Sequence, residues 1–223
     1  DNLTDLAVLK IRANNLSTIP QNSARQAHVG DVVLAIGNPY NLGQSVSQGI
    51  ISAVGRNAVG DSVGRQNFIQ TDASINRGNS GGALINSAGE LVGISTLSIG
   101  KTANEIAEGL NFAIPMDIAN DVLQKIIRDG RVIRGYFGVQ SDISSSSEEG
   151  IVITGVSPNS PAAKAGIQLG DVILKLNNQE GISAREMMQI IANTKPNSKV
   201  LVTILRLGKI LQLPVVIEEF PVN

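Results

Sequence analysis

Apolar residues in this chain gather in short runs of strand length, each closed by glycine, asparagine or proline. Residues 6–11 (LAVLKI) and 31–36 (DVVLAI) are two such runs, and residues 83–85 and 91–97 predict a hairpin across the turn at 86–89 (NSAG). Many short strands at close spacing are typical of a β-barrel or a β-sandwich. We therefore expect a mostly β fold.

In one segment the apolar residues follow the spacing of a helix and not that of a strand. Apolar residues recur at helical spacing between Pro115 and Asp129. Proline suits the first turn of a helix, and Gly130 suits the position just past its end. We expect this helix to close a first domain, residues 1–133, and a second domain to occupy residues 134–223.

The second domain shows a mixed pattern. Residues 183–186 (SARE) form a capping box, which predicts a helix through Ala192. Apolar runs predict strands at 151–156, 171–176, 199–206 and 210–217. This domain is therefore expected to be α+β.

Composition excludes several kinds of chemistry. The chain of 223 residues has no cysteine and one histidine, which excludes disulfides, thiolate sites and a multi-histidine metal site. Its net charge is −1 and it has no long basic run, so we expect no nucleic-acid partner. No apolar run approaches the roughly 18 residues that a membrane span needs. We expect no metal and no cofactor.

Residues 76–82 (NRGNSGG) carry the most specific chemical signal. A serine hydroxyl is a poor nucleophile unless a base and an oxyanion-binding cradle stand beside it. Glycine allows backbone N–H groups to approach a substrate carbonyl closely, so we assign the oxyanion donors to the N–H groups of Gly78 and Ser80. Taken alone, the same residues also fit a plain turn between two strands.

The longer stretch at residues 71–82 (TDASINRGNSGG) resembles the nucleophile motif of the HtrA (Deg) family. Residues 4–10 (TDLAVLK), 37–39 (GNP) and 112–115 (FAIP) match further motifs of that family. The resemblance spans the whole chain and implies a trypsin-like double β-barrel protease domain followed by a PDZ domain. It also implies that the N-terminal barrel is incomplete here.

The resemblance makes Ser80 the nucleophile and Asp5 the acid of a catalytic triad, although an aspartate before an apolar run also fits a turn residue or a cap. His28, the one histidine, follows Asp5, whereas a trypsin-like enzyme has the order His, Asp, Ser. The order Asp, His, Ser belongs to subtilisin-like enzymes, whose parallel α/β fold needs helices that the pattern lacks. We expect His28 to be a loop residue and the triad histidine to lie in an N-terminal part outside this chain. By itself, the chain should then hydrolyse peptides very poorly or not at all.

The family match also implies where a substrate would bind. Substrate contacts are expected at Ile75, Asn76, Ser95, Thr96 and Leu97. Because no acidic side chain stands at the first two of these positions, we expect cleavage after a small apolar residue.

Residues 135–139 (GYFGV) resemble the carboxylate loop of PDZ domains, which captures the C-terminus of a peptide through backbone N–H groups. The expected peptide contacts are Tyr136, Phe137, Gly138, Val139 and Met188. Helical spacing predicts that Met187 and Ile191 pack in the core instead.

Three positions match regulatory loops of the family, namely Arg56, Tyr40 and Gln70. The resemblance implies a periplasmic enzyme, anchored to the inner membrane through its absent N-terminus and assembled as a homotrimer. Its substrate would be a membrane-tethered anti-sigma factor, and its activators the C-termini of misfolded outer-membrane proteins. Two alternatives remain: a catalytically inactive PDZ scaffold or chaperone, and a quality-control protease with two PDZ domains of which this chain is a truncated part.

Overall fold

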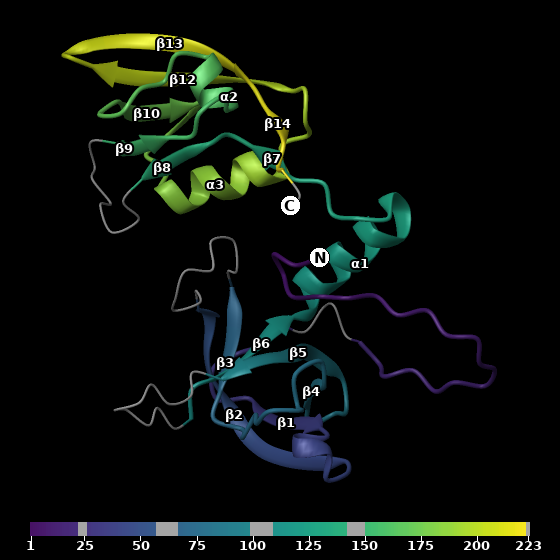
Figure 1. Ribbon diagram of the computed structural model, residues 1–223. Coiled ribbons are helices and arrows are strands. Elements are labelled where there is room, and N and C mark those ends of the chain that lie inside the picture. The colour runs from purple at the N-terminus through teal and green to yellow at the C-terminus, as the bar shows by residue number, and fades with distance from the viewer. Residues whose placement is uncertain (22–25, 57–66, 99–108, 142–149, 222–223) are drawn as a thin grey trace. The chain divides into compact units, whose positions relative to one another are not determined.

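The computed structural model describes residues 1–21, 26–56, 67–98, 109–141 and 150–221, and the chain divides into two compact units, Asp1–Val132 and Ile133–Asn223. The first unit is built on six antiparallel strands that close into a barrel in the order β1-β2-β3-β6-β5-β4 (Figure 1). The strands are β1 (Val32–Gly37), β2 (Ser45–Arg56), β3 (Phe68–Thr71), β4 (Ala83–Asn86), β5 (Leu91–Ser98) and β6 (Asn111–Pro115).

Every second side chain of a strand points into the barrel, and these side chains fill its interior. Val33 and Ala35 of β1 point inward, and they meet Ile51, Ile69 and Leu84 from three other strands in one buried cluster. A closed barrel has no free edge, so every one of its strands finds a backbone partner. The predicted hairpin is confirmed, because β4 pairs with β5 antiparallel across residues 87–90.

Helix α1 (Met116–Asp129) follows β6 directly and buries Ala119 and Val122. Pro115 is its N-cap residue, and Gly130 ends it with a positive φ of 75°, in the left-handed conformation that glycine adopts without strain. The predicted helix is thus confirmed at both ends. A short 3₁₀ turn, η1 (Pro39–Asn41), lies between β1 and β2.

The expected strand at residues 6–11 is absent from the structure. These residues are extended but irregular, and Leu9 is 89 % exposed (Figure 1). A strand needs a hydrogen-bonded neighbour, and the backbone here is bonded only at Leu6, to Asp1, within the described residues. Apolar composition was therefore insufficient to predict a strand.

The second unit combines an antiparallel sheet, ordered β13-β12-β10-β9-β8 with β11 beside β10, and a small ladder of β14 and β7. Helices α2 and α3 complete this α+β unit. The elements are β7 (Gly135–Tyr136), β8 (Val139–Ser141), β9 (Ile151–Val156), α2 (Pro161–Lys164), β10 (Val172–Leu176), β11 (Gln179–Glu180), α3 (Ala184–Asn193), β12 (Lys199–Arg206), β13 (Lys209–Val216) and β14 (Glu218–Glu219).

Local signals predict most of this unit. The capping box at Ser183 and Glu186 is present and opens α3. Helix α2 was not predicted, although Ser160 as N-cap followed by Pro161 is a recognised start signal. The helix has only four residues, which is too short for apolar periodicity to reveal.

A partly buried ion pair joins the β9–β10 region to β12. Arg206 donates from Nε and from a terminal nitrogen to the two carboxylate oxygens of Asp171, each at 2.7 Å, and Asp171 is 1 % exposed. Burial pushes the pKa of Asp171 upward, but the hydrogen bonds from Arg206 and from the Gln168 N–H, with the charge of Arg206, outweigh it. The net pKa of Asp171 is lowered.

None of the helices in the described part of the chain has the length and apolar character that crossing a membrane requires.

Candidate active site

Ser80 stands on a tight turn between β3 and β4. The Asn79 N–H donates to the Asn76 carbonyl at 2.9 Å, and the Gly82 N–H donates to the Asn79 carbonyl at 2.9 Å. Ser95 of β5 then bonds both neighbouring glycines, because its carbonyl accepts from the Gly81 N–H at 2.7 Å and its N–H donates to the Gly82 carbonyl at 2.9 Å. These bonds present Ser80 as an exposed residue at the barrel rim.

Two positions of the turn require glycine because neighbouring backbone atoms leave no room for a Cβ. Gly78 has φ 102°, and a Cβ there would overlap the carbonyl oxygen of Asn38. A Cβ on Gly82 would overlap the carbonyl oxygen of Ile36. The glycines of the motif therefore let the turn lie directly against the end of β1, a requirement that an ordinary surface turn does not have.

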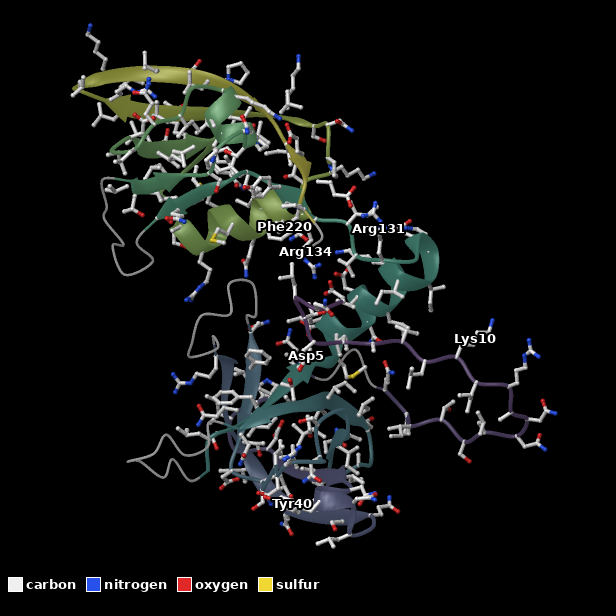
Figure 2. The ribbon with its side chains drawn as sticks, in the orientation of Figure 1. Asp5, Lys10, Tyr40, Arg131, Arg134 and Phe220 are labelled. Carbon is white, nitrogen blue, oxygen red and sulfur yellow. The ribbon has the colours of Figure 1, made fainter. Side chains whose placement is uncertain are left out.

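Thr96 of β5 joins Ser80 to Asp5. The Ser80 Oγ donates to the Thr96 carbonyl oxygen at 2.6 Å, and the Thr96 Oγ1 donates to the Asp5 carboxylate at 2.9 Å. Asp5, labelled in Figure 2, comes from the irregular N-terminal segment and has φ 58°. Thr96 thus contacts the expected nucleophile through its backbone carbonyl and the expected acid through its side chain.

The oxyanion donors expected at Gly78 and Ser80 are unengaged. Within the described residues, neither backbone N–H has a hydrogen-bond acceptor. The Arg77 carbonyl accepts from the Tyr40 N–H at 2.9 Å. In a trans peptide the N–H is antiparallel to the carbonyl, so the Gly78 N–H points away from Tyr40. Both donors are therefore free to bind a developing oxyanion.

The expected substrate contacts have different environments. Asn76 is exposed on the turn, and Thr96 lies beside Ser80. Ile75 is 4 % exposed and packs in the barrel core, and Ser95 is fully buried with no hydrogen-bond partner for its hydroxyl. The backbone of Leu97 pairs with Phe112 of β6. Their roles in substrate binding stay predictions.

The three positions that match regulatory loops of the family make two contacts. Tyr40 has φ 54°, an unusual conformation for a bulky residue. Its N–H donates to the Arg77 carbonyl, in the turn at residues 76–82 that carries the expected nucleophile (the nucleophile turn). Arg56, the last residue of β2, donates from Nε to the Gln70 side chain at 3.2 Å on the neighbouring strand. Residues 57–66, which would continue the regulatory loop expected at Arg56, lie outside the described residues.

His28 stands in the loop before β1, as expected. It is exposed, and its backbone N–H donates to the Asp31 carboxylate at 3.0 Å. Its side chain also faces Asp31, with 3.9 Å between Nδ1 and the nearer oxygen. The contacts of His28 are therefore with Asp31, and the Ser80 proton is directed to a carbonyl oxygen, which cannot act as a general base.

In the loop at residues 135–139, two backbone carbonyls accept hydrogen bonds, whereas the N–H groups of the same two residues donate none within the described part of the chain. The Phe137 carbonyl accepts from the Ala162 N–H at 2.9 Å, and the Gly138 carbonyl accepts from the Ser157 N–H at 2.9 Å. In the described part of the chain, the N–H groups of Phe137 and Gly138 have no acceptor. This arrangement leaves amide donors free for an anionic ligand such as a carboxylate.

The side chains of the same loop are divided between core and surface. Phe137 is buried in the core of the second unit, whereas Tyr136 and Val139 are half-buried. Met188 on α3 is also half-buried. Met187 and Ile191 belong to the buried cluster, which confirms the prediction for those two.

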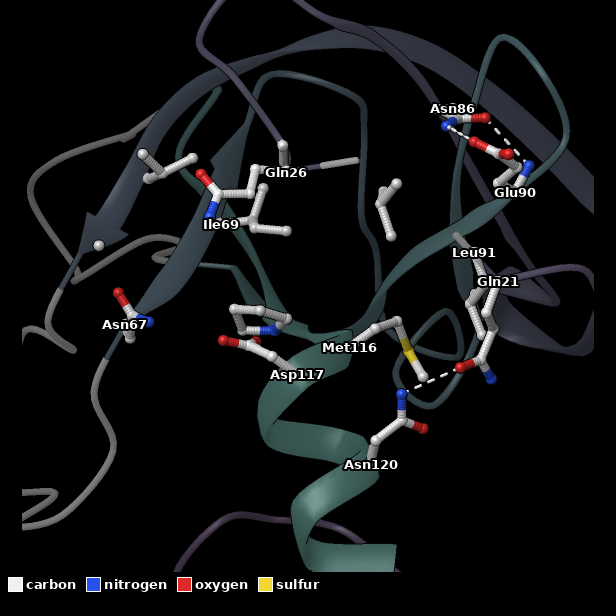
Figure 3. Close-up of a pocket in the computed structure, with 15 residues that line it drawn as sticks. Gln21, Gln26, Asn67, Ile69, Asn86, Glu90, Leu91, Met116, Asp117 and Asn120 are labelled. Carbon is white, nitrogen blue, oxygen red and sulfur yellow. Dashed lines mark hydrogen bonds between the residues drawn. The ribbon is translucent and has the colours of Figure 1, made fainter. Parts of the chain in front are cut away.

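A separate cavity of about 460 Å³ opens at the barrel end that α1 adjoins (Figure 3). Met116, Asp117 and Asn120 of α1 line it, and Asn120 donates to the Gln21 side chain at 3.0 Å. Neither Asp5 nor any residue of the nucleophile turn is among its lining residues. The described residues also hold no cluster of three or more histidine, aspartate or glutamate side chains suited to a metal ion.

Family models agree with this architecture. A trypsin-like peptidase domain matches residues 1–94, and a PDZ domain matches residues 125–205. The fold and the site therefore define a trypsin-like peptidase domain joined to a PDZ domain.

The serine endoprotease DegS of Haemophilus influenzae is 96 % identical over the whole chain, which covers 66 % of that protein. DegS of Escherichia coli is 54 % identical over 99 % of the chain and 65 % of that protein. The chain thus spans about two thirds of the length of these relatives.

Solved structures show the same fold. The serine endoprotease from Yersinia pestis is 53 % identical, with a TM-score of 0.86 over 99 % of this chain and 74 % of that one. The HtrA-type protease AlgW with a decapeptide is 42 % identical, with a TM-score of 0.90 over 100 % of this chain and 70 % of that one. The chain belongs to the HtrA family of serine proteases, as its motifs indicated.

Proposed function

We propose that this chain carries the nucleophile and the peptide sensor of a regulated serine endopeptidase. The observation that carries the proposal is the hydrogen-bonded connection from Ser80 through Thr96 to Asp5. It stands beside two unengaged N–H groups, at Gly78 and Ser80, that can stabilise an oxyanion. The protease domain is assigned to residues 1–133 and the PDZ domain to residues 134–223.

In the proposed reaction, Ser80 attacks the scissile carbonyl after losing its proton to a histidine, which Asp5 would orient and stabilise as imidazolium. That histidine would come from a part of the protein outside these residues. Before the attack, the Ser80 hydroxyl must leave the Thr96 carbonyl and turn toward the base, because only a base makes the hydroxyl nucleophilic.

The proposed substrate is a membrane-tethered anti-sigma factor, cleaved after a small apolar residue. Support comes from the family resemblance and from the absence of acidic side chains at Ile75 and Asn76. A series of peptides that differ only in the residue before the scissile bond tests this assignment. Faster cleavage after valine or alanine is expected, and a preference for lysine or arginine would contradict it.

The proposed activators are C-termini of misfolded outer-membrane proteins, bound at residues 136–139. The open amides of Phe137 and Gly138 support this assignment, and AlgW structures are described with a decapeptide and with a tripeptide. We further propose a homotrimer in the bacterial periplasm, anchored to the inner membrane. A 40 % identical relative, DegQ of Escherichia coli, is named a periplasmic endoprotease.

Labelling of the complete polypeptide with a fluorophosphonate probe tests the nucleophile. We expect labelling of the wild type, loss of labelling in Ser80→Ala, and full labelling in Ser87→Ala, which removes an exposed hydroxyl from the β4–β5 turn.

A catalytically inactive PDZ scaffold is the second candidate. It is favoured by one observation, namely that the Ser80 hydroxyl contacts a carbonyl and that no base contacts it within the described residues. A complete polypeptide that binds C-terminal peptides but takes up no probe at Ser80 would favour the scaffold over the enzyme.

A further inference from the structure

The last described strand of the chain lies beside the carboxylate loop. In the ladder of β14 and β7, Glu218 pairs with Tyr136 and Glu219 pairs with Gly135. One residue further on, the Phe220 N–H donates to the Arg134 carbonyl at 2.8 Å (Figure 2). The C-terminal segment therefore holds the strand from which the loop begins.

Phe220 also contacts the first side chain of the loop. Its ring meets the ring of Tyr136 edge to face, with centroids 5.6 Å apart and planes at 90°. Phe220 is 38 % exposed, so the hydrophobic core does not enclose it. Phe220 thus packs against the aromatic ring of a residue that is expected to border the peptide.

Tyr136 transmits this contact to the amide donors. A Cβ placed on Gly138 would stand 2.9 Å from the Tyr136 Oη and would overlap the Cβ of Ser160. The Tyr136 side chain therefore reaches from Phe220 at one end to the backbone of Gly138 at the other. A displacement of the Tyr136 ring would therefore alter its contact with the backbone of Gly138.

Ser160 and α2 hold the opposite side of the loop. The Ser160 hydroxyl donates to the Gly138 carbonyl at 3.3 Å, and the Ala162 N–H holds the Phe137 carbonyl. An ion pair of Lys164 with Glu218, 2.6 Å between Nζ and the carboxylate, then joins α2 to β14. The loop is thus enclosed by β14 on one side and by α2 on the other.

We propose that Phe220 is a positioning residue for the peptide sensor. By fixing the Tyr136 ring, it holds the Phe137 and Gly138 amides in the geometry that receives a terminal carboxylate. This inference rests on the proposed function, since it assumes that residues 136–139 bind a C-terminus. It adds that the segment at residues 218–220, which lies outside the carboxylate loop, sets the affinity of that loop for a terminal carboxylate.

The test measures binding of two fluorescein-labelled decapeptides to the 223-residue chain. Both copy the C-terminus of an outer-membrane porin, one with a free carboxylate and one amidated, and the readout is the ratio of their Kd values. An edge-to-face aromatic pair contributes enough that its loss corresponds to about a two- to tenfold change in an equilibrium constant. We expect Phe220→Ala to weaken binding of the peptide with the free carboxylate by that factor. The ratio of the two Kd values should then come closer to one.

Three variants make the result specific. Phe220→Tyr keeps the ring and should keep the wild-type ratio. Lys164→Ala removes the ion pair, whose partners are 58 % and 43 % exposed, and should change binding less than twofold because exposed pairs contribute little. Leu207→Ala truncates a 97 % exposed apolar residue in the same unit and should change nothing.

The outcomes separate the two proposals. If the wild type binds the free and the amidated peptide equally, or binds neither, carboxylate sensing fails and the role of Phe220 fails with it. If the wild type prefers the carboxylate and Phe220→Ala keeps that preference in full, only the positioning role is overturned. A purely structural loss would lower the fraction of binding-competent protein without changing the ratio, and that result would also overturn it.

Discussion

The Ser80 hydroxyl donates its hydrogen bond to the backbone carbonyl of Thr96, 2.6 Å away. The side chain of the same threonine donates to Asp5 at 2.9 Å. One residue of β5 therefore sets the distance between the nucleophile and the acid of the proposed triad.

Thr96→Val keeps the shape of the side chain but removes its hydroxyl, so Asp5 loses a hydrogen-bond donor. A hydrogen bond to a charged group contributes about 1.5–3 kcal/mol. We expect kcat/KM for peptide cleavage by the complete polypeptide to fall by about tenfold or more. Thr96→Ser keeps the donor and should retain most activity, and equal losses in both variants would contradict the role of the hydroxyl.

Gly78→Ala should abolish productive labelling by the fluorophosphonate probe. The substitution combines a strained φ of 102° with a steric overlap on the Asn38 carbonyl, so the turn that carries Ser80 must shift. Gly89→Ala is the matched control, since Gly89 also has a positive φ of 77° but has open space around its Cα. We expect about 1 kcal/mol of destabilisation there and unchanged labelling, measured by probe uptake and urea unfolding.

Asp171→Asn should destabilise the second unit and change its response to pH. The substitution removes the negative charge and one of the two acceptor oxygens that face Arg206, whose side chain is 24 % exposed and also donates to the Gly166 carbonyl. We expect a loss of about 2 kcal/mol at pH 7. Since the pKa of Asp171 is lowered on folding, its contribution is present above the unfolded value of 3.8 and is lost as the pH falls through the lower folded value.

Urea unfolding between pH 7 and pH 2 measures this effect. The stability difference between wild type and Asp171→Asn should be constant above about pH 5 and should shrink in acid. A difference that stays constant down to pH 2 would show that the folded pKa of Asp171 is not lowered in the way its contacts with Arg206 indicate.

Arg56→Ala should reduce the stimulation of cleavage by C-terminal peptides. Arg56 is bonded to Gln70 on β3, the strand that leads into the nucleophile turn, so its loss removes a tie between that strand and β2. Stimulated and unstimulated rates of the complete polypeptide measure the effect. Arg128→Ala, which removes an exposed arginine paired with Asp129 on α1, is the control, and identical stimulation in both variants would contradict a role for Arg56.

Local patterns predicted the regular elements well where their signals lie in contiguous residues. The capping box before α3 and the glycine after α1 are each contained in a few neighbouring positions. Apolar runs predicted strands β1, β4 and β5 of the barrel, but they also predicted one at residues 6–11. That error arose because a strand depends on a partner, and the run itself holds no information on whether one is present.

The sequence by itself determined the turn signal around Ser80, because the freedom of Gly78 to adopt a φ of 102° is a property of glycine alone. Only the tertiary structure decided that Thr96 connects Ser80 with Asp5, that Arg56 reaches Gln70, and that Phe220 packs on Tyr136. Each of these contacts joins residues far apart along the chain. They form only when the barrel closes and when the two strands of the β7–β14 ladder pair, since hydrogen bonds and ring contacts act over a few ångströms in space.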